Sequence, residues 1–144
     1  MEIFKRIMGI DYGSKRIGIA ISDPLNIIAQ GVGVIENNNK KFDEIEKLVA
    51  KNNVNKIVVG LPLGLKGQKG QSARDAEQFT RELEEKLSVQ VFFLDERFTS
   101  SIAHQTLRNM NVRKRERQSK ERIDIMSAAI ILQNYLDMMN SSKK

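Results

Sequence analysis

The sequence contains no cysteine, and its 144 residues include only one histidine. Without cysteine, neither a disulfide nor a thiolate zinc site can form, and this composition fits a reducing compartment. No segment approaches the ~18 consecutive apolar residues that a membrane-spanning helix requires. The N-terminal MEIFKRIM also lacks the apolar core of a signal peptide. We therefore expect a cytoplasmic protein that does not associate with membranes.

Length and charge narrow the class of protein further. A chain of 144 residues is about one ordinary domain, and we expect a single domain over 1–138 followed by a short polar tail over 139–144. The 24 Lys and Arg residues exceed the 18 Asp and Glu residues, which gives a formal charge of +6. Such a charge favours an anionic partner, nucleic acid first, although a merely basic protein would show the same sum.

The first third of the chain has the apolar patterning of β-strands. Three strands are expected, over 2–12, 16–23 and 27–35. In the second of them Ile17, Ile19 and Ile21 alternate with smaller residues, which is typical of a half-buried strand. The connections are so short that they favour an antiparallel meander.

The remainder alternates between helical and strand patterns. We expect helices over 41–51, 72–87, 100–110 and 120–139, and buried strands over 56–62 and 89–96. Ser72 and Asp75 predict a capping box at the second helix. The order β-β-β-α-β-α-β-α-α implies an α/β fold with a mixed five-stranded sheet and helices on both sides. Its two late strands should run parallel to the first.

Carboxylates interrupt apolar sequence at three distant points. Asp11 lies inside the first strand, Asp95 and Glu96 end a late strand, and Asp124 heads an apolar stripe in the last helix. The stripe is formed by Ala128, Ile131, Tyr135 and Met138. Because sites in α/β sheets gather at the carboxyl ends of parallel strands, we expect these acids to meet.

Each acid also has an ordinary structural explanation. Asp11 could cap a turn, and Asp95 and Glu96 could be loop charges or could pair with Arg97. Asp124 could favour the positive end of its helix. Taken together, these explanations require three coincidences, and the mutual repulsion of the acids would oppose folding. A divalent cation would remove that repulsion.

The available donors decide which cation the acids would hold. The single histidine, His104, falls in a predicted helix far in sequence from the acids, and we expect it at the surface. Oxygen-only ligation points to Mg²⁺ or Mn²⁺. Clustered carboxylates that hold such ions are typical of phosphodiester hydrolysis.

Basic residues lie where they could contact phosphates. Lys15 and Arg16 follow Asp11 in a turn, and the glycine-rich loop GLPLGLKGQKGQS carries Lys66 and Lys69 just before a helix start, which attracts anions. This loop is not a Walker A motif, because the spacing is wrong and a glutamine stands where the lysine should be.

A second basic segment, NVRKRERQSKER, leads directly into the last helix. It includes Arg113, Lys114 and Arg115, which we expect to contact a nucleic-acid backbone unless the run is simply a solvated segment. Aromatic residues are not interleaved with these charges, so base stacking is not expected.

Four motifs together resemble the RuvC-related YqgF family: GIDYGSKRIGIAISD, GLPLGLKGQKG, LDERFTS and IDIMSAAIILQNYL. The match spans about residues 7–138 and implies an RNase H-like fold. Members are described as Holliday junction resolvases and as the nuclease that processes the 5′ end of pre-16S ribosomal RNA.

The resemblance also implies which acids are functional. It assigns catalysis and metal binding to Asp11, Glu96 and Asp124. Asp95 could exchange roles with Glu96, although strand alternation sends the two to opposite faces and only one should ligate. Glu121, one turn before Asp124, is a weaker fourth ligand.

The favoured function is a metal-dependent nuclease that processes pre-16S ribosomal RNA, in which Lys15, Arg16 and Arg97 neutralise the scissile phosphate. The alternatives are a Holliday junction resolvase, a non-catalytic ribosome assembly factor and an actin-like nucleotide-binding protein. The preference for RNA over branched DNA rests on the family's description and on no single residue. Monomer and homodimer both stay open, since a symmetric junction would call for a dimer.

Overall fold

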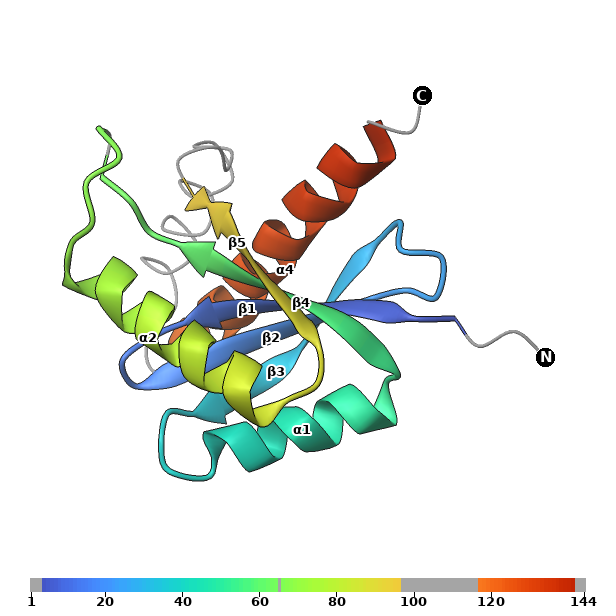
Figure 1. Cartoon of the computed structure of the whole chain (residues 1–144), viewed down its shortest axis with the longest axis horizontal. Helices are drawn as coiled ribbons and strands as arrows, with labels where there is room; N and C mark the ends of the chain where they lie inside the picture. The colour runs from blue at the N-terminus through green and yellow to red at the C-terminus, as the bar shows by residue number, and fades with distance from the viewer. Residues whose placement is uncertain (1–3, 65, 97–116, 142–144) are drawn as a thin grey trace.

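The computed structural model describes residues 4–64, 66–96 and 117–141 (Figure 1). The described elements are β1 (Arg6–Tyr12), β2 (Arg16–Ser22), β3 (Ala29–Glu36), α1 (Lys41–Lys51), β4 (Val54–Leu61), α2 (Gln71–Lys86), β5 (Gln90–Asp95) and α4 (Arg117–Ser141). The helix expected over 100–110 lies outside the described residues. Among the helices that are described, none has both the length and the apolar character that crossing a membrane requires.

The five strands form one mixed sheet in the order β3-β2-β1-β4-β5. β1 pairs antiparallel with β2, and β2 pairs antiparallel with β3, whereas β4 is parallel to both β1 and β5. The predicted mixed sheet is therefore confirmed. Because β1, β4 and β5 run in the same direction, their carboxyl ends lie at one edge of the sheet (Figure 1).

Helices α1 and α2 cover one face of the sheet with large side chains (Figure 1). Phe79 of α2 is 2% exposed, and its ring lies 4.4 Å from that of Tyr12 and 5.6 Å from that of Phe42. Around these rings the strands contribute long aliphatic side chains: Met8, Ile10, Ile17, Ile19, Ile57 and Val59. This face is an ordinary apolar core, whose burial drives folding.

Helix α4 covers the opposite face (Figure 1). There the strands carry glycines among the buried apolar residues Ile7, Ala20, Val58 and Leu94. A Cβ atom at Gly9 would lie 2.6 Å from Leu132 Cβ, and one at Gly18 would collide with the backbone carbonyl of Asp124. The missing side chains let α4 approach the sheet closely. As a result β2 is buried on both faces, and the prediction of a half-buried strand is wrong.

Three further sequence predictions about packing are wrong. β5 is an edge strand rather than a buried one, with Phe92 and Phe93 39% and 42% exposed. The capping box does not form, because α2 begins at Gln71 after Gly70 and its start has no side-chain cap. In α4, Ala128 and Ile131 are buried as predicted, but Met138 is 58% exposed. The buried stripe passes through the leucines at 132 and 136 instead.

Candidate functional site

Asp11 lies within β1, where it is paired with Gly18 of β2, so it does not cap a turn. Its side chain shares the sheet face of Gly9, the face against which α4 packs. Burial raises the pKa of Asp11 to about 6, and the negative charge of Asp124 contributes to the shift. The first strand and the last helix therefore bring two carboxylates together.

Glu96 directly follows β5 and lies on the same side of the sheet. A Cβ atom at Gly60 would be 3.1 Å from Glu96 Cδ and Oε2, so the absence of a side chain at this position of β4 makes room for the carboxylate. Burial raises the pKa of Glu96 to about 7, with smaller contributions from the charges of Asp11 and Asp95. Glu96 thus interacts electrostatically with Asp11.

Strand alternation separates Asp95 from Glu96. Asp95 is paired in register with Leu61, which packs on the α2 side of the sheet. Successive residues of a strand point to opposite faces, so Glu96 falls on the side of Asp11. The geometry favours Glu96 over Asp95 as the partner of Asp11.

Asp124 lies about two turns inside α4, which begins at Arg117 and has no acidic residue in its first turn. The helix dipole acts within the first turn, so the positive end of the helix does not explain this aspartate. The Asp124 carboxylate instead accepts a hydrogen bond of 2.7 Å from Arg16 Nε at its Oδ2 atom. Both side chains are 25% exposed, so this ion pair is accessible to solvent.

The donor chemistry of these acids fits a divalent cation. Carboxylate oxygens are the ligands that Mg²⁺ and Mn²⁺ prefer, and a cation would offset the repulsion and burial that raise the pKa of Asp11 and Glu96. As the side chains stand, however, no three acidic or histidine residues of the described segments are grouped closely enough to hold a metal ion jointly. The site consists of two interacting pairs, Asp11 with Asp124 and Asp11 with Glu96, while Arg16 engages Asp124.

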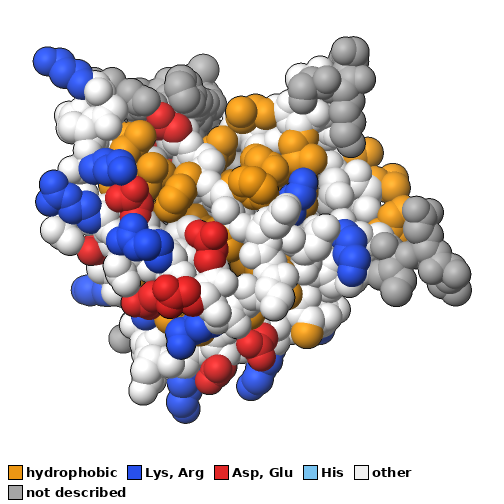
Figure 2. Space-filling view, viewed as in Figure 1, with side chains coloured by type: hydrophobic (Ala, Val, Ile, Leu, Met, Phe, Trp, Pro, Cys, Tyr) orange, Lys and Arg blue, Asp and Glu red, His pale blue; other side chains and the backbone are white. Residues whose placement is uncertain are grey.

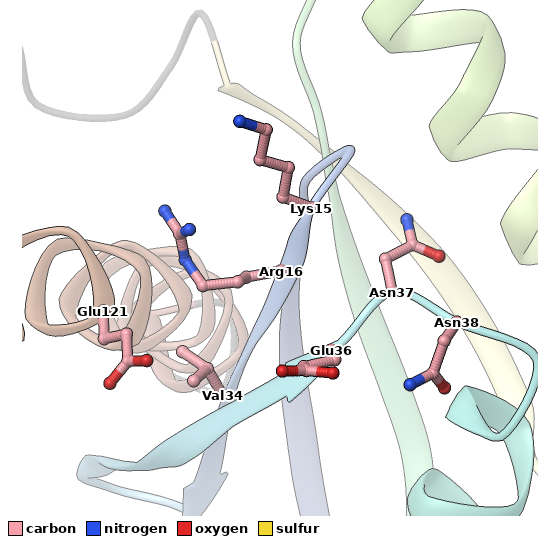
Figure 3. A pocket seen from close by; sticks show the side chains of 7 residues that line it. All are labelled: Lys15, Arg16, Val34, Glu36, Asn37, Asn38 and Glu121. Atoms are coloured by element: carbon pink, nitrogen blue, oxygen red, sulfur yellow. The ribbon is translucent and has the colours of Figure 1, made fainter. Parts of the chain in front are cut away.

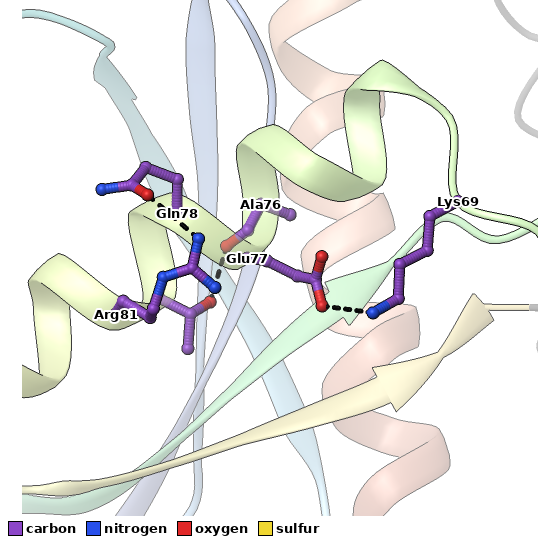
Figure 4. A network of polar contacts seen from close by, with 6 residues as sticks. Lys69, Ala76, Glu77, Gln78 and Arg81 are labelled. Atoms are coloured by element: carbon purple, nitrogen blue, oxygen red, sulfur yellow. Dashed lines mark hydrogen bonds and ion pairs between the residues drawn. The ribbon is translucent and has the colours of Figure 1, made fainter.

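The predicted phosphate-binding residues have different environments. Lys15 is exposed in the turn between β1 and β2, and Lys66 is exposed in the loop between β4 and α2. Lys69 forms an ion pair of 2.7 Å with Glu77 of α2 (Figure 4). Arg97, Arg113, Lys114 and Arg115 lie outside the described residues, as does His104.

The described residues on the face covered by α1 and α2 do not form a basic patch. Figure 2 shows Lys and Arg side chains there interspersed with Asp and Glu. This mixture is typical of a solvated surface, and a nucleic-acid backbone would be attracted more strongly by a cluster of one sign.

A cavity of about 330 Å³ lies beside Arg16 and was not predicted from the sequence. Its lining comes from the start of β2, the end of β3, the loop that follows and the start of α4 (Figure 3): Lys15, Arg16, Val34, Glu36, Asn37, Asn38 and Glu121. Glu121, the weaker metal candidate, faces this cavity. The run of asparagines after β3 indicated only a loop, so no signal in the sequence pointed to the cavity.

Comparison with known proteins gives consistent results. A family model described as RuvX, Holliday junction resolvase, matches residues 5–138. A protein of Sulfurihydrogenibium sp. (strain YO3AOP1) named "Putative pre-16S rRNA nuclease" is 42% identical over 141 residues, which are 96% of this chain and 94% of that protein. A protein of Listeria monocytogenes serotype 4b (strain CLIP80459) with the same name is 43% identical over 94% of this chain and 99% of its own length.

Solved structures agree on the fold. The structure of T. thermophilus RuvC in complex with Holliday junction substrate matches with a TM-score of 0.56 at 13% identity, covering 93% of this chain and 96% of that chain. A second Thermus thermophilus RuvC structure matches with a TM-score of 0.52 at 11% identity, covering 94% and 96%. At these identities the likeness concerns the fold alone, and the predicted RNase H-like fold is confirmed.

Proposed function

The chain belongs to the RuvX family of Holliday junction resolvases and is a nuclease, and we propose that it processes the 5′ end of pre-16S ribosomal RNA with the help of a divalent cation. Curated relatives named for pre-16S rRNA support this substrate, because they are 42–43% identical over nearly their whole length. The observation that carries the chemistry is that acids from β1, the end of β5 and α4 lie on one side of the sheet, where Asp11 interacts electrostatically with each of the other two.

In the proposed mechanism Asp11, Glu96 and Asp124 would together hold Mg²⁺ or Mn²⁺. When bound, such an ion lowers the pKa of a water nucleophile and stabilises the leaving oxygen. Asp11 interacts electrostatically with both other acids, which supports its central position. Asp95 is on the opposite strand face and Glu121 faces the neighbouring cavity, so neither is a ligand in this proposal.

Arg16 has a double role in this mechanism. In the structure its Nε donates to Asp124, which keeps one oxygen of that carboxylate engaged. We propose that the guanidinium turns to the scissile phosphate when substrate binds, so that Asp124 is released toward Asp11 and Glu96. Arg16 would then neutralise the phosphate together with Lys15, since guanidinium groups bind phosphate well.

The other predicted phosphate contacts extend this proposal. Lys66 and Lys69 would contact the nucleic-acid backbone beyond the scissile phosphate, and Lys69 would exchange Glu77 for a phosphate. Arg97, Arg113, Lys114 and Arg115 would add further backbone contacts, each of which makes binding more sensitive to salt.

The proposal is tested by incubating a precursor RNA and a four-way DNA junction with wild type and with Asp11→Asn in Mg²⁺ or Mn²⁺. We expect wild type to cleave the RNA and Asp11→Asn to cleave it at least about 100-fold more slowly. Mutating a residue that only hydrogen-bonds to a metal ligand already lowers activity by about 10–100-fold, and Asp11 is a proposed ligand itself. The matched control is Asp43→Asn, which changes an exposed aspartate of α1. If Asp11→Asn cleaves RNA at the wild-type rate, the proposed site is wrong.

Holliday junction resolution is the second candidate. The family description favours it, and the fold is that of RuvC. Symmetric cleavage of the junction by wild type, with no cleavage of precursor RNA, would select this function. It would also require a homodimer in solution, because two symmetric cuts need two active sites.

A further inference from the structure

The cavity beside Arg16 has the size of a site for part of one nucleotide. Its volume of about 330 Å³ lies at the lower end of the range for small-molecule sites. Figure 3 shows Arg16 and Glu121 on one side and Asn37 and Asn38 on the other, with Glu36 between them. Side chains from three separate segments of the chain, 15–16, 34–38 and Glu121, therefore converge on one hollow.

Arg16 connects this cavity to the carboxylate site. It lines the cavity, and its Nε donates to Asp124 at 2.7 Å. Glu36 is paired in register with Arg16 across β2 and β3, just as Val34 is paired with Gly18. A nucleic-acid strand bound at Asp11 and Asp124 would thus place a neighbouring nucleotide over the cavity.

The charges of the lining disfavour a phosphate inside the cavity. Among the described residues of the lining, two cations, Lys15 and Arg16, are balanced by two carboxylates, Glu36 and Glu121. A phosphate would be repelled by these carboxylates, whereas a hydroxyl group can donate a hydrogen bond to either of them. None of the described residues that line the cavity is aromatic, and they offer no surface on which a base could stack.

Hydrogen bonds within the loop show which polar groups are available to a ligand. Asn37 Nδ2 donates to the carbonyl oxygen of Gly13, and Asn38 Oδ1 accepts from the backbone N–H of Lys40. These bonds engage one polar atom of each asparagine, and no described residue accepts a hydrogen bond from the Asn38 amide nitrogen. In the described part of the chain, no hydrogen bond or ion pair engages the carboxylate of Glu36.

We propose that this cavity is a ribose subsite, in which Glu36 accepts a hydrogen bond from the 2′-hydroxyl of a nucleotide next to the scissile phosphate and Asn38 donates to the same hydroxyl. The 2′-hydroxyl can both donate and accept, and it is the group by which a protein distinguishes RNA from DNA. This inference rests on the proposed nuclease function and deepens it, because it locates a preference for RNA in residues outside the acidic site.

The test uses one precursor RNA and a set of copies with a single 2′-deoxy nucleotide at each position near the cleavage site. We expect wild type to lose about tenfold in kcat/KM at one of these positions, which is the value of a hydrogen bond to a charged group. In Glu36→Ala and Asn38→Ala that penalty should shrink toward onefold. The matched controls are Glu46→Ala and Asn39→Ala, exposed residues outside the lining, which should keep the wild-type penalty.

A binding measurement separates failure of this inference from failure of the proposed function. In Asp11→Asn, which should bind without cutting, the same 2′-deoxy position should weaken affinity, and adding Glu36→Ala should remove the difference. If wild type cuts RNA but no 2′-deoxy position matters, or if Glu36→Ala keeps the full penalty, the ribose subsite is wrong. If wild type cuts no nucleic acid, the proposed function fails, and the binding comparison still decides on the subsite.

Discussion

The two faces of the sheet are built on opposite principles. Toward α1 and α2 the strands present long aliphatic and aromatic side chains that enclose Phe79. Toward α4 they present Gly9, Gly18 and Gly60, and two candidate catalytic acids, Asp11 in β1 and Glu96 just after β5, lie on this side as well. The first face stabilises the fold through apolar burial, whereas the second gives up side-chain volume so that a helix backbone and a set of carboxylates can approach. Variants on the first face should therefore change stability alone, whereas variants at the glycines and acids of the second face should also change activity.

The largest effect on stability is expected from Phe79→Ala on the α2 side. Removing a buried phenylalanine should lower the free energy of unfolding by about 3–5 kcal/mol, measured by urea denaturation. Any protein that remains folded should keep the wild-type kcat. Phe93→Ala is the matched control, since Phe93 is 42% exposed, and it should cost far less. Equal losses in the two variants would contradict the description of this face as the main core.

The next largest effect is expected from Gly18→Ala on the α4 side. The new methyl group would collide with the backbone carbonyl of Asp124, so α4 must shift and carry the aspartate with it. We expect a loss of about 1–3 kcal/mol in stability, together with a fall in kcat that exceeds the loss of folded protein.

Gly33→Ala is the control for this variant, because nothing lies within 4 Å of a Cβ at that position. It should change neither cleavage nor stability strongly. Wild-type kcat in Gly18→Ala would show that the close approach of α4 is not required for the site.

The acids on the α4 side should also give the metal-free protein an unusual pH dependence. The folded-state pKa values of Asp11 and Glu96 are raised, from 3.8 to about 6 and from 4.5 to about 7. The folded state therefore holds these protons more tightly than the unfolded state. Their stabilising contribution is complete below about pH 4 and is lost as the pH rises to about 7–8. We expect the free energy of unfolding in EDTA to fall by several kcal/mol over this range, because each of the two shifts corresponds to about 3 kcal/mol.

Denaturation of Glu96→Gln at pH 5 and pH 8 tests the origin of this fall. The variant should show a smaller decrease than wild type, and Glu46→Gln, an exposed glutamate of α1, should show the full decrease. If all three proteins lose the same free energy, the acids near Glu96 are not the cause. Mg²⁺ should raise the Tm of wild type more at pH 8 than at pH 5, because the carboxylates must be ionised to bind it.

The smallest effect is expected from the ion pair of Lys69 and Glu77, which lies at the surface. Lys69 is 50% exposed, so Lys69→Ala should change the free energy of unfolding by less than about 1 kcal/mol. If Lys69 contacts the nucleic-acid backbone, the variant should raise KM and weaken the salt dependence of binding, while Glu77→Gln should do the opposite. An unchanged KM in both variants would remove Lys69 from the proposed binding surface.

Much of the architecture follows from local sequence patterns. The helix predicted over 41–51 has the bounds of α1, and the mixed sheet follows from the order of the elements. The errors arise where the local sequence does not show which other element packs against a strand. Because the side chains of Gly18 and Ala20 are small, the face of β2 that carries them was predicted to be exposed to solvent, but it is buried. The apolar residues of β5 predicted a buried strand, although β5 lies at the edge of the sheet.

The site divides in the same way. Asp11 and Asp124 stood out because carboxylates are rare inside apolar sequence, and strand alternation already required that only one of Asp95 and Glu96 could join them. The ion pair between Arg16 and Asp124 and the cavity containing Glu36 did not stand out. Both join residues distant in the chain, and polar residues at the ends of strands are common.

The sequence by itself determined the order of the elements, the mixed sheet and the identity of the acids, because these depend on periodicity and on the cost of placing charge in apolar segments. Only the tertiary structure decided that α4 packs directly on the glycines of β1 and β2, that Glu96 rather than Asp95 lies on the side of Asp11, and that Arg16 engages Asp124. These features depend on how closely segments that are distant in the sequence can pack together. Local sequence patterns do not show which distant segments will be in contact.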